Sequence, residues 1–180
     1  WLMKAEPNSR VEKGKDVKFS VDDFESVKTT QWEGVRNHEA KNHMKSMSVG
    51  DKVLFYHSNC KVPGMCYMQV SKEAYPDCTC GGLDHPYYDA KTDQEKPRWY
   101  MVDVTFTARA THFVPYPFLR DVGASGSAEP PEGVEYIGVE GVAAIKGMEL
   151  VRRGRLSVQK VEAKAFETIE KMAGRGGWTE

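Results

Sequence analysis

Alternation of apolar and polar residues predicts several short strands along this chain. The clearest is at 99–107, where every second side chain is apolar or aromatic and those between them are mostly polar. A period of two is typical of a strand with one buried face. A run of apolar residues at 52–57 indicates a strand buried on both faces, with an antiparallel partner at 65–70. The predicted strands are 1–4, 52–57, 65–70, 99–107 and 156–159.

Apolar residues three or four positions apart predict helices between these strands. A capping-box pattern at Ser20 precedes one or two turns with helical spacing. A second helix is predicted at 39–47, and Asn37 is the candidate for its N-cap. The last helix is predicted over 163–173, where Gly174 ends it.

Three segments are predicted as loops. Residues 8–18 are polar and charged, and 71–98 is a long stretch rich in turn residues, of the kind that is usually functional or disordered. Residues 121–141 combine Gly, Ser and Pro with acidic side chains and have no basic one, so we expect a mobile acidic loop. Its acidic residues are Asp121, Glu129, Glu132, Glu135 and Glu140.

Short strands and helices that do not alternate regularly predict an α+β fold. The expected architecture is a small closed or half-closed antiparallel β-barrel with short helices on its rim. The chain has 180 residues and a mass of 20.3 kDa, which favours a single domain over 1–180. No apolar run approaches the roughly 18 residues of a membrane span, so no membrane partner is expected. As a separate expectation, the protein is a monomer.

Charge and cysteine content narrow the class of partner and cofactor. The net charge is -1, so any contact with nucleic acid must come from local basic patches. The four cysteines, Cys60, Cys66, Cys78 and Cys80, lack the paired spacing of a zinc site. Cys78 and Cys80 with His85 would still be one ligand short. We therefore expect no metal and no cofactor.

Catalytic motifs are absent from the sequence. It has no Walker A loop, dinucleotide-binding glycine pattern, zinc-protease motif or nucleophile elbow. A nucleophile and base would have to come from Cys60 or Ser58 beside His57 or His112, with no legible orienting group or oxyanion site. We expect a protein that is not an enzyme. An enzyme acting on a modified base through His57 or Cys60 remains the alternative, and a protein-interaction module using 71–98 is a third hypothesis.

A mixture of aromatic and hydrogen-bonding residues indicates a binding pocket. Residues 31–37 combine an indole, a carboxylate, a guanidinium and an amide, which suit a pocket wall better than a core. A structural loop with a half-buried Trp32 is the alternative. Tyr56 to Asn59 repeat the mixture at a strand end, and a flipped-out base needs such a set. The basic run 152–155 suits phosphates, or is simply the solvated start of a strand.

Several motifs, in order along nearly the whole chain, resemble the EVE domain family. They are Trp1 to Pro7, Trp32 to Asn37, Phe55 to Asn59, Lys72 to Asp77, Trp99 to Val104 and Arg155 to Val158. The resemblance implies a PUA-like β-barrel related to YTH and ASCH domains, which are nucleic-acid readers and not enzymes. It also implies DNA as the partner, with RNA as the other candidate, and recognition of a modified base, expected to be a modified cytosine.

The same resemblance places seven residues around the base pocket. They are Lys4, Trp32, Arg36, Asn37, Tyr56, His57 and Ser58. From side-chain chemistry, Trp32 would stack on or cap the base, Asn37 and Ser58 would bond its edge, and Lys4 and Arg36 would meet phosphate, the edge or Glu6. Replacement of Trp32 by alanine is expected to abolish selective binding and leave the fold largely intact. The residues expected to bind phosphate are Arg152, Arg153 and Arg155.

The remaining expectations concern the location of the protein in the cell and two segments in which this sequence departs from the EVE family. A eukaryotic member of the family is expected in the nucleus, and a bacterial one in the cytoplasm. The acidic segment at 121–141 is longer than the family usually has, which puts partner contacts on that side in doubt. The turn from Cys78 to Gly82 also looks particular to this chain.

Overall fold

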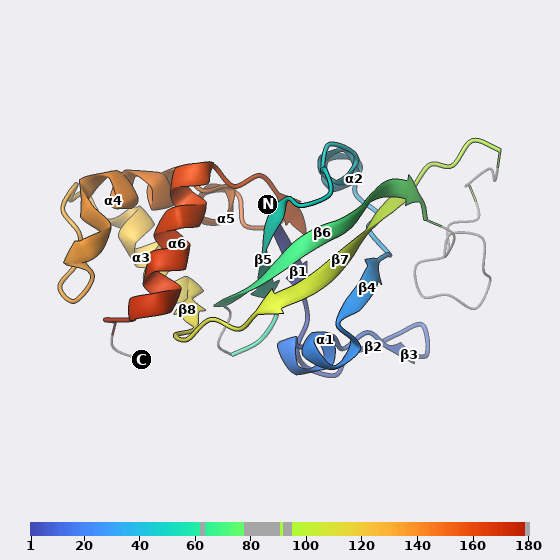
Figure 1. The fold of residues 1–180 in the computed structure, drawn as a ribbon, viewed down its shortest axis with the longest axis horizontal. Coiled ribbons are helices and arrows are strands. Elements are labelled where there is room, and N and C mark those ends of the chain that lie inside the picture. The colour runs from blue at the N-terminus through green and yellow to red at the C-terminus, as the bar shows by residue number, and fades with distance from the viewer. Residues whose placement is uncertain (62–63, 78–90, 92–94, 179–180) are drawn as a thin grey trace.

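The computed structural model describes residues 1–61, 64–77, 91 and 95–178. It has one large sheet with helices around it and a separate two-stranded hairpin (Figure 1). The strands are β1 Leu2–Ala5, β2 Val11–Glu12, β3 Lys15–Asp16, β4 Thr29–Trp32, β5 Lys52–His57, β6 Gly64–Pro76, β7 Tyr100–Ala108, β8 Val114–Pro115 and β9 Val158–Gln159. The helices are α1 Val21–Val27, α2 His38–Lys45, α3 Tyr116–Ala124, α4 Gly138–Gly147, α5 Glu149–Arg152 and α6 Ala163–Arg175, with a 3-10 turn, η2, at Glu135–Ile137.

Strand β1 lies next to the edge of the sheet, between β5 and the short edge strand β9. The strand order is β4-β7-β6-β5-β1-β9, and β8 pairs with β6. Each pair is antiparallel except β1 with β5, which is parallel. Leu2 is level with Leu54 of β5 on one side and with Gln159 of β9 on the other. The same register sets Lys4 beside Tyr56, so two of the predicted pocket residues become neighbours.

The α+β class is confirmed, whereas closure of the sheet into an antiparallel barrel is not. Pairing among the described strands ends at β4 on one side and at β9 on the other, and the parallel β1–β5 pair makes the sheet mixed. Helix α2 contacts β9 as well as β6 and β7. Helix α2 thus packs against strands that are distant in the strand order and do not pair with one another.

Two segments predicted as loops contain strands. Strand β6 continues to Pro76, so the first residues of the predicted 71–98 loop are paired with β7. The register of this pair shifts three times, and such bulges interrupt the alternation by which a strand is recognised. Residues 78–90 and 92–94 of the same loop lie outside the described residues. Within 8–18, β2 and β3 form a hairpin.

The prediction of a mobile acidic loop at 121–141 was wrong, because much of this segment is helical. Helix α3 extends into it, and η2 and α4 occupy its last part. The error came from weighing Gly, Pro and acidic residues above the apolar ones among them, since Val122, Val134 and Ile137 are buried. Gly141 lies so close to Ile137 and to α6 that a side chain there would not fit without movement, which allows α4 to pack on α6.

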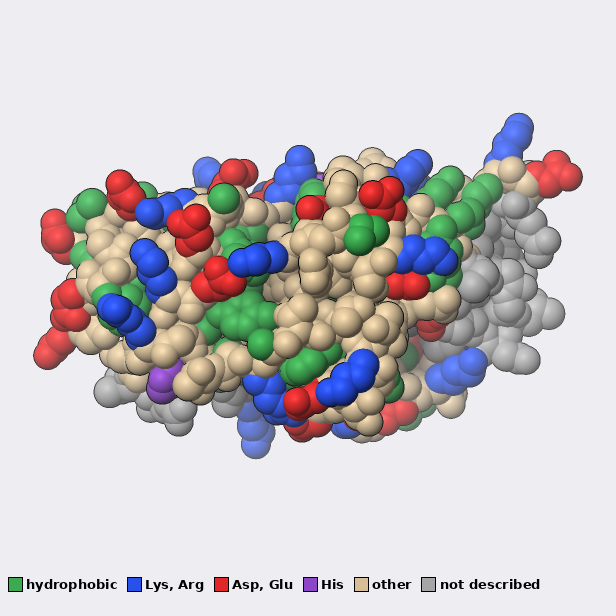
Figure 2. Space-filling model, in the orientation of Figure 1, with side chains coloured by type: hydrophobic (Ala, Val, Ile, Leu, Met, Phe, Trp, Pro, Cys, Tyr) green, Lys and Arg blue, Asp and Glu red, His purple; other side chains and the backbone are tan. Residues whose placement is uncertain are grey.

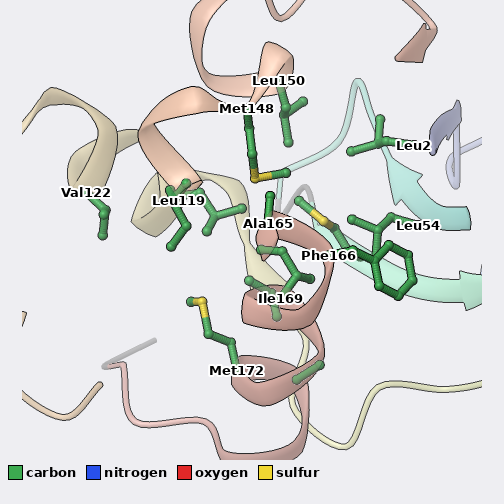
Figure 3. Packing of buried hydrophobic residues seen from close by; sticks show 14 of the residues in the cluster. Leu2, Leu54, Leu119, Val122, Met148, Leu150, Ala165, Phe166, Ile169 and Met172 are labelled. Atoms are coloured by element: carbon green, nitrogen blue, oxygen red, sulfur yellow. The ribbon is translucent and has the colours of Figure 1, made fainter. Parts of the chain in front are cut away.

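Alternating side chains of β1 and β5 separate two hydrophobic cores. Leu54 and Tyr56 face the core that α3, α4 and α6 cover, and Figure 3 shows Leu54 beside Phe166 of α6. Val53 and Phe55 face the second core, which lies against α1 and α2. The apolar run predicted as a strand buried on both faces is therefore confirmed.

Both predicted N-caps are present. Ser20 Oγ accepts a hydrogen bond from Asp23 N–H at 3.2 Å, and the Asp23 carboxylate accepts one from Ser20 N–H at 2.8 Å, so the box works with Asp in its last place. Asn37 Oδ1 accepts from Ala40 N–H at 3.0 Å. The two caps fix where α1 and α2 begin. The stretch around Trp32 lies between the end of α1 and the start of α2.

Candidate functional site

A cleft of about 1050 Å³ opens where distant segments of the chain meet. Its walls come from 4–6, 15–19 and 30–36, with further lining residues at Arg10, Tyr56, Ser58, Asn59, Gly154, Arg155 and Ser157. Ligand pockets in proteins commonly measure roughly 300–1000 Å³. The cleft is at the upper end of that range, so it has room for more than one planar ring.

Trp32 belongs both to the cleft wall and to a hydrophobic core. Its side chain is only 8% exposed, and its ring meets those of Phe19 and Phe55 edge to face, with centroid distances of 6.3 and 5.9 Å. Phe19 also lines the cleft. The expectation that the fold tolerates Trp32→Ala is therefore corrected, because truncation of a packed indole leaves a cavity in the core.

Asp77 fixes the loop that carries Arg36. Its carboxylate, fully buried, accepts from Arg36 Nη1 at 2.7 Å and from Gly34 N–H at 3.1 Å. Gly34 has a φ of +78°, a conformation that other residues rarely adopt. The glycine therefore allows the turn, and the carboxylate sets the direction of the guanidinium at the cleft wall.

Basic side chains outnumber acidic ones around the cleft. Some are neutralised by neighbours: Arg10 pairs with Glu6, and Lys18 pairs with Asp23. Arg36 is held in the same way by Asp77, so the basic residues of the lining that have no ion pair among the described residues are Lys4, Lys15 and Arg155. The basic residues are Lys4, Arg10, Lys15, Lys18, Arg36 and Arg155, and the acidic ones are Glu6, Asp16 and Glu33.

Lys4 connects three segments of the cleft wall. Its ammonium donates to the Gly154 carbonyl and lies 5.2 Å from the centre of the Tyr56 ring. Burial lowers the pKa of the Lys4 amine below its ordinary value. Nearby, Ser58 Oγ donates to the Ala5 carbonyl at 3.1 Å. The hydroxyl oxygen of Ser58 can still accept a hydrogen bond from a ligand.

The structure brings together five of the seven residues predicted around the pocket and one of the three predicted phosphate ligands. Lys4, Trp32, Arg36, Tyr56, Ser58 and Arg155 all line the cleft. The remaining four do not line it. The Asn37 side chain caps α2, and Arg153 pairs with Glu39 at 2.6 Å. Arg152 is exposed at the end of α5.

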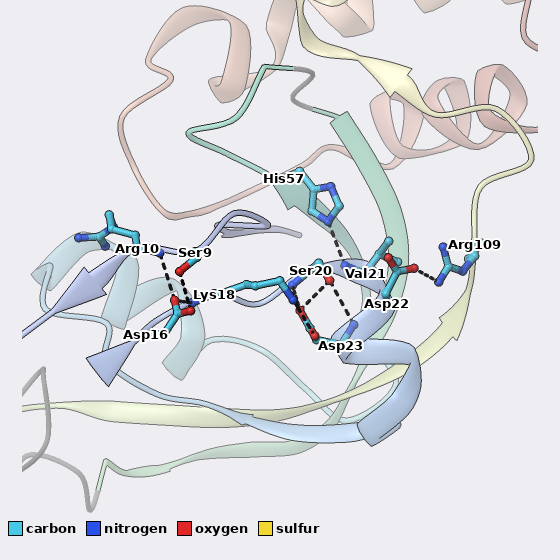
Figure 4. A network of polar contacts seen from close by, with 10 residues as sticks. All are labelled: Ser9, Arg10, Asp16, Lys18, Ser20, Val21, Asp22, Asp23, His57 and Arg109. Atoms are coloured by element: carbon cyan, nitrogen blue, oxygen red, sulfur yellow. Dashed lines mark hydrogen bonds and ion pairs between the residues drawn. The ribbon is translucent and has the colours of Figure 1, made fainter. Parts of the chain in front are cut away.

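His57 does not line the cleft, and its ring is directed toward Val21 at the start of α1 (Figure 4). Its Nε2 accepts a hydrogen bond from Val21 N–H at 3.0 Å, which places the ring proton on Nδ1. Burial lowers the pKa of the imidazole below its ordinary value of 6.5; Asp22 acts to raise it and Arg109 to lower it further. His57 is therefore a neutral acceptor at a helix start, where a positive charge is disfavoured.

This histidine makes stability depend on pH between neutral and mildly acidic conditions. The unfolded chain binds a proton at His57 as the pH falls through about 6.5, whereas the folded chain resists it. The stabilisation is fully present above that pH and is lost below it. We expect the urea midpoint of the wild type to fall more between pH 7 and 5 than that of His57→Gln, whose amide oxygen can accept the same bond. Parallel pH profiles for the two proteins would refute this.

Sequence reasoning missed part of the cleft. Lys15 and Lys18 stand in the 8–18 stretch predicted as a surface loop, and Phe19 directly follows it. Asp77 stands in the stretch predicted as the long 71–98 loop. The sequence holds a signal for each. For the hairpin segment the signal is a glycine turn with basic residues around it. For Asp77 it is a lone carboxylate after a strand, which would be costly to bury without a cation.

Neither a metal site nor a helix able to span a membrane is found in the described part of the chain. The one cysteine whose side chain is described as a free thiol, Cys60, is partly exposed. Cys78, Cys80 and His85, considered above for zinc, lie outside the described residues, as does the Cys78 to Gly82 turn.

Comparison with known proteins identifies the family. The family model of the EVE domain matches residues 1–172. The chain belongs to the EVE domain family. Human thymocyte nuclear protein 1 is 40% identical to this EVE domain over 172 residues, which cover 94% of the present chain and 71% of the human protein. An uncharacterized protein of Schizosaccharomyces pombe is 30% identical over 179 residues, covering 96% of this chain and 67% of the yeast protein.

Solved structures of relatives share the fold of this EVE domain. Human thymocyte nuclear protein 1 in complex with DNA containing 5-methylcytosine is 39% identical, with a TM-score of 0.85 and 96% of each chain covered. A protein from Pseudomonas syringae is 30% identical, with a TM-score of 0.76, 96% of this chain and 98% of that chain covered. The sequence-based resemblance to EVE domains is thus confirmed.

Proposed function

We propose that this EVE domain is a DNA-binding reader that accepts a modified cytosine in its cleft. The observation that carries the proposal is the similarity to the human relative in complex with 5-methylcytosine DNA, at a TM-score of 0.85 over 96% of both chains. The cleft adds support, because it combines aromatic rings, hydrogen-bonding groups and positive charge in a space of about 1050 Å³.

Each cleft residue has a role that its chemistry suits. The rings of Trp32 and Phe19 offer apolar surface for a planar base and for the methyl group of 5-methylcytosine. Ser58 Oγ and the guanidinium of Arg36 offer an acceptor and donors for the base edge. Lys4, Lys15 and Arg155 provide positive charge for phosphates. Asn37 and His57 support the walls through helix α2 and helix α1, and Arg152 and Arg153 are outside the proposed site.

The enzyme hypothesis loses its proposed base. His57 Nε2 already accepts from a backbone N–H, and burial keeps the imidazole neutral at a helix start. This nitrogen would have to give up that bond before it could take a proton from Cys60 or a substrate. We therefore propose a reader without catalytic activity. Because the vertebrate relatives are called nuclear proteins, we also propose a nuclear location. The monomeric state expected from the sequence stays a prediction.

The proposal is tested by binding to short duplexes that differ only at one cytosine. We expect the purified chain to prefer 5-methylcytosine or 5-hydroxymethylcytosine over cytosine. Trp32→Phe keeps a ring in the core but shortens the wall, and it is expected to reduce this preference about threefold to tenfold, in keeping with about 0.5–1.5 kcal/mol for aromatic contacts.

Trp178→Phe is the matched control. Trp178 is a partly buried tryptophan that packs on Phe118, in the core away from the cleft, and its replacement should leave the preference unchanged. Equal affinity of the wild type for modified and unmodified duplexes would overturn the proposed function. A single-stranded RNA bound more tightly than any duplex would instead identify RNA as the target.

A further inference from the structure

A group of cations lies against aromatic rings along α2, directly beyond the cleft. The guanidinium carbons of Arg36 and Arg98 and the ammonium of Lys41 lie 5.6, 5.2 and 5.9 Å from the centre of the Trp99 ring. The ammonium of Lys45 lies 4.4 Å from the centre of the Tyr100 ring. We call His38, Lys41, Lys45 and Arg98, with these two rings, the α2 stripe.

The stripe concentrates positive charge. His38 packs on Trp99 with a centroid distance of 4.9 Å, and its two ring nitrogens lie 3.4 Å from Lys41 Nζ and 3.2 Å from Arg98 Nη2. A neutral imidazole has one acceptor nitrogen, so it can accept from only one of these two cations. The cations also repel one another across a single ring. An anion placed at this surface would reduce that repulsion.

Several other exposed cations are held by carboxylates. Arg109 pairs with Asp22 and Glu25, Arg153 with Glu39, and Lys164 with Glu140. Lys41 and Lys45 make aromatic contacts, and neither has an ion pair among the described residues. Glu39, the acidic residue of α2, is engaged by Arg153. A cation that rests on a ring keeps its charge available to a ligand, and the ring limits its freedom.

Lys72 shows a similar contact but belongs elsewhere. Its ammonium lies 3.7 Å from the centre of the Tyr75 ring, yet Asp103 stands level with it on β7 and accepts from the Tyr75 hydroxyl at 2.5 Å. A carboxylate therefore faces Lys72, and we leave it out of the stripe. In Figure 2, Lys and Arg side chains lie beside hydrophobic ones over α2 and the adjoining ends of β6 and β7, with some acidic ones among them.

The stripe is continuous with the cleft. Arg36 both lines the cleft and rests over Trp99, and α2 begins two residues after it. Lys41 and Lys45 are four residues apart, so they share one face of the helix. Nucleic acid whose base occupies the cleft and whose backbone runs past Arg36 would meet the stripe as the adjoining charged surface.

We propose that the α2 stripe binds phosphates of the duplex that flanks the recognised base, with Lys41 and Lys45 as direct ligands. The inference rests on the proposed function, and it differs from the sequence-based expectation, which assigned phosphates to Arg152, Arg153 and Arg155. The chemistry is sequence-independent: ammonium groups contact the backbone and set the register of the DNA, and the cleft reads the base.

The test compares two charge-neutralised double variants on helices. Lys41→Gln/Lys45→Gln changes the stripe, and Lys164→Gln/Lys171→Gln makes the same change on the exposed face of α6, in the helical layer away from α2 (Figure 1). Affinities for methylated and unmodified duplexes are measured between about 50 and 200 mM salt. The stripe variant should bind both duplexes roughly tenfold more weakly, with a salt slope about 2 smaller and an unchanged preference for the methylated one. The α6 variant should behave as the wild type.

The outcomes separate this inference from the proposed function. A selective wild type whose affinity and salt slope survive in the stripe variant would overturn the inference and leave the proposed function standing. If the wild type binds modified and unmodified duplexes equally, and the salt slope falls only in the stripe variant, phosphate binding by the stripe is supported and the proposed function as a reader is overturned. Equal losses in both double variants would overturn the stripe, because charge anywhere on the surface would then suffice. A wild type that binds no duplex would overturn both.

Discussion

Replacing Trp32 with alanine is expected to lower the free energy of unfolding by about 3–5 kcal/mol, the usual cost of removing a buried aromatic side chain. The indole is 8% exposed and makes edge-to-face contacts with Phe19 and Phe55, which the variant loses together with the volume of the ring. Because folded domains are stable by only about 5–15 kcal/mol, this loss would bring a domain at the low end of that range close to unfolding, so DNA binding by the variant has to be compared with its stability. Urea denaturation followed by circular dichroism measures the change.

The comparison variant is Trp32→Phe, which fills most of the same volume. We expect it to lose less than about 1.5 kcal/mol, as volume-conserving core replacements do. A Trp32→Ala protein that unfolds at the same urea concentration as the wild type would show that the indole is not part of the core. In that case the simpler alanine variant would become the better probe of the cleft.

Removal of the Asp77 carboxylate is the second large effect that we expect. Asp77→Ala leaves the partly buried Arg36 guanidinium and the Gly34 N–H without the acceptor they share. Breaking a buried ion pair from one side costs about 3–5 kcal/mol, and the low end applies because the Arg36 side chain keeps 19% exposure. The loop from Gly34 to Arg36 also loses its anchor, so affinity for DNA should fall in parallel with stability.

Two further variants define how Asp77 acts. Asp77→Asn keeps an oxygen that can accept one of the two bonds but removes the charge, and an intermediate loss of about 1–2 kcal/mol is expected. Asp121→Ala breaks an exposed Arg–Asp pair with Arg120 at 3.2 Å, which should cost less than about 1 kcal/mol. Equal urea midpoints for Asp77→Ala and Asp121→Ala would contradict the role of the buried carboxylate.

Local patterns explain which elements the sequence could predict. The alternation at 99–107, the apolar run at 52–57 and the caps at Ser20 and Asn37 depend on neighbours in the chain, and all appear in the structure as predicted. The segment at 121–141 could not be resolved in the same way, because its helices are stabilised by burial against α6. Local residue preferences are weak beside such packing.

The site was predictable where recognition chemistry is concentrated in a short stretch. Trp32 and Arg36 fall within five residues of one another, and both line the cleft. Asp77 lies 41 residues beyond Arg36 in the sequence, and no local pattern links the two. His57 illustrates the opposite error: a polar residue at a strand end looked like a ligand group, but the fold directs it to a backbone N–H.

The pairing of β1 with both β5 and β9 has a consequence for how the cleft forms. Leu2 pairs with Leu54 and with Gln159, so the strand that carries Lys4 needs partners from two remote parts of the chain. Closing loops of that length costs entropy before any contact repays it, and such pairings form slowly. A partly folded chain therefore lacks one wall of the cleft altogether. The cleft is therefore complete only when β1 has docked on both β5 and β9, and any ligand held there would stabilise the whole fold and not one segment of it.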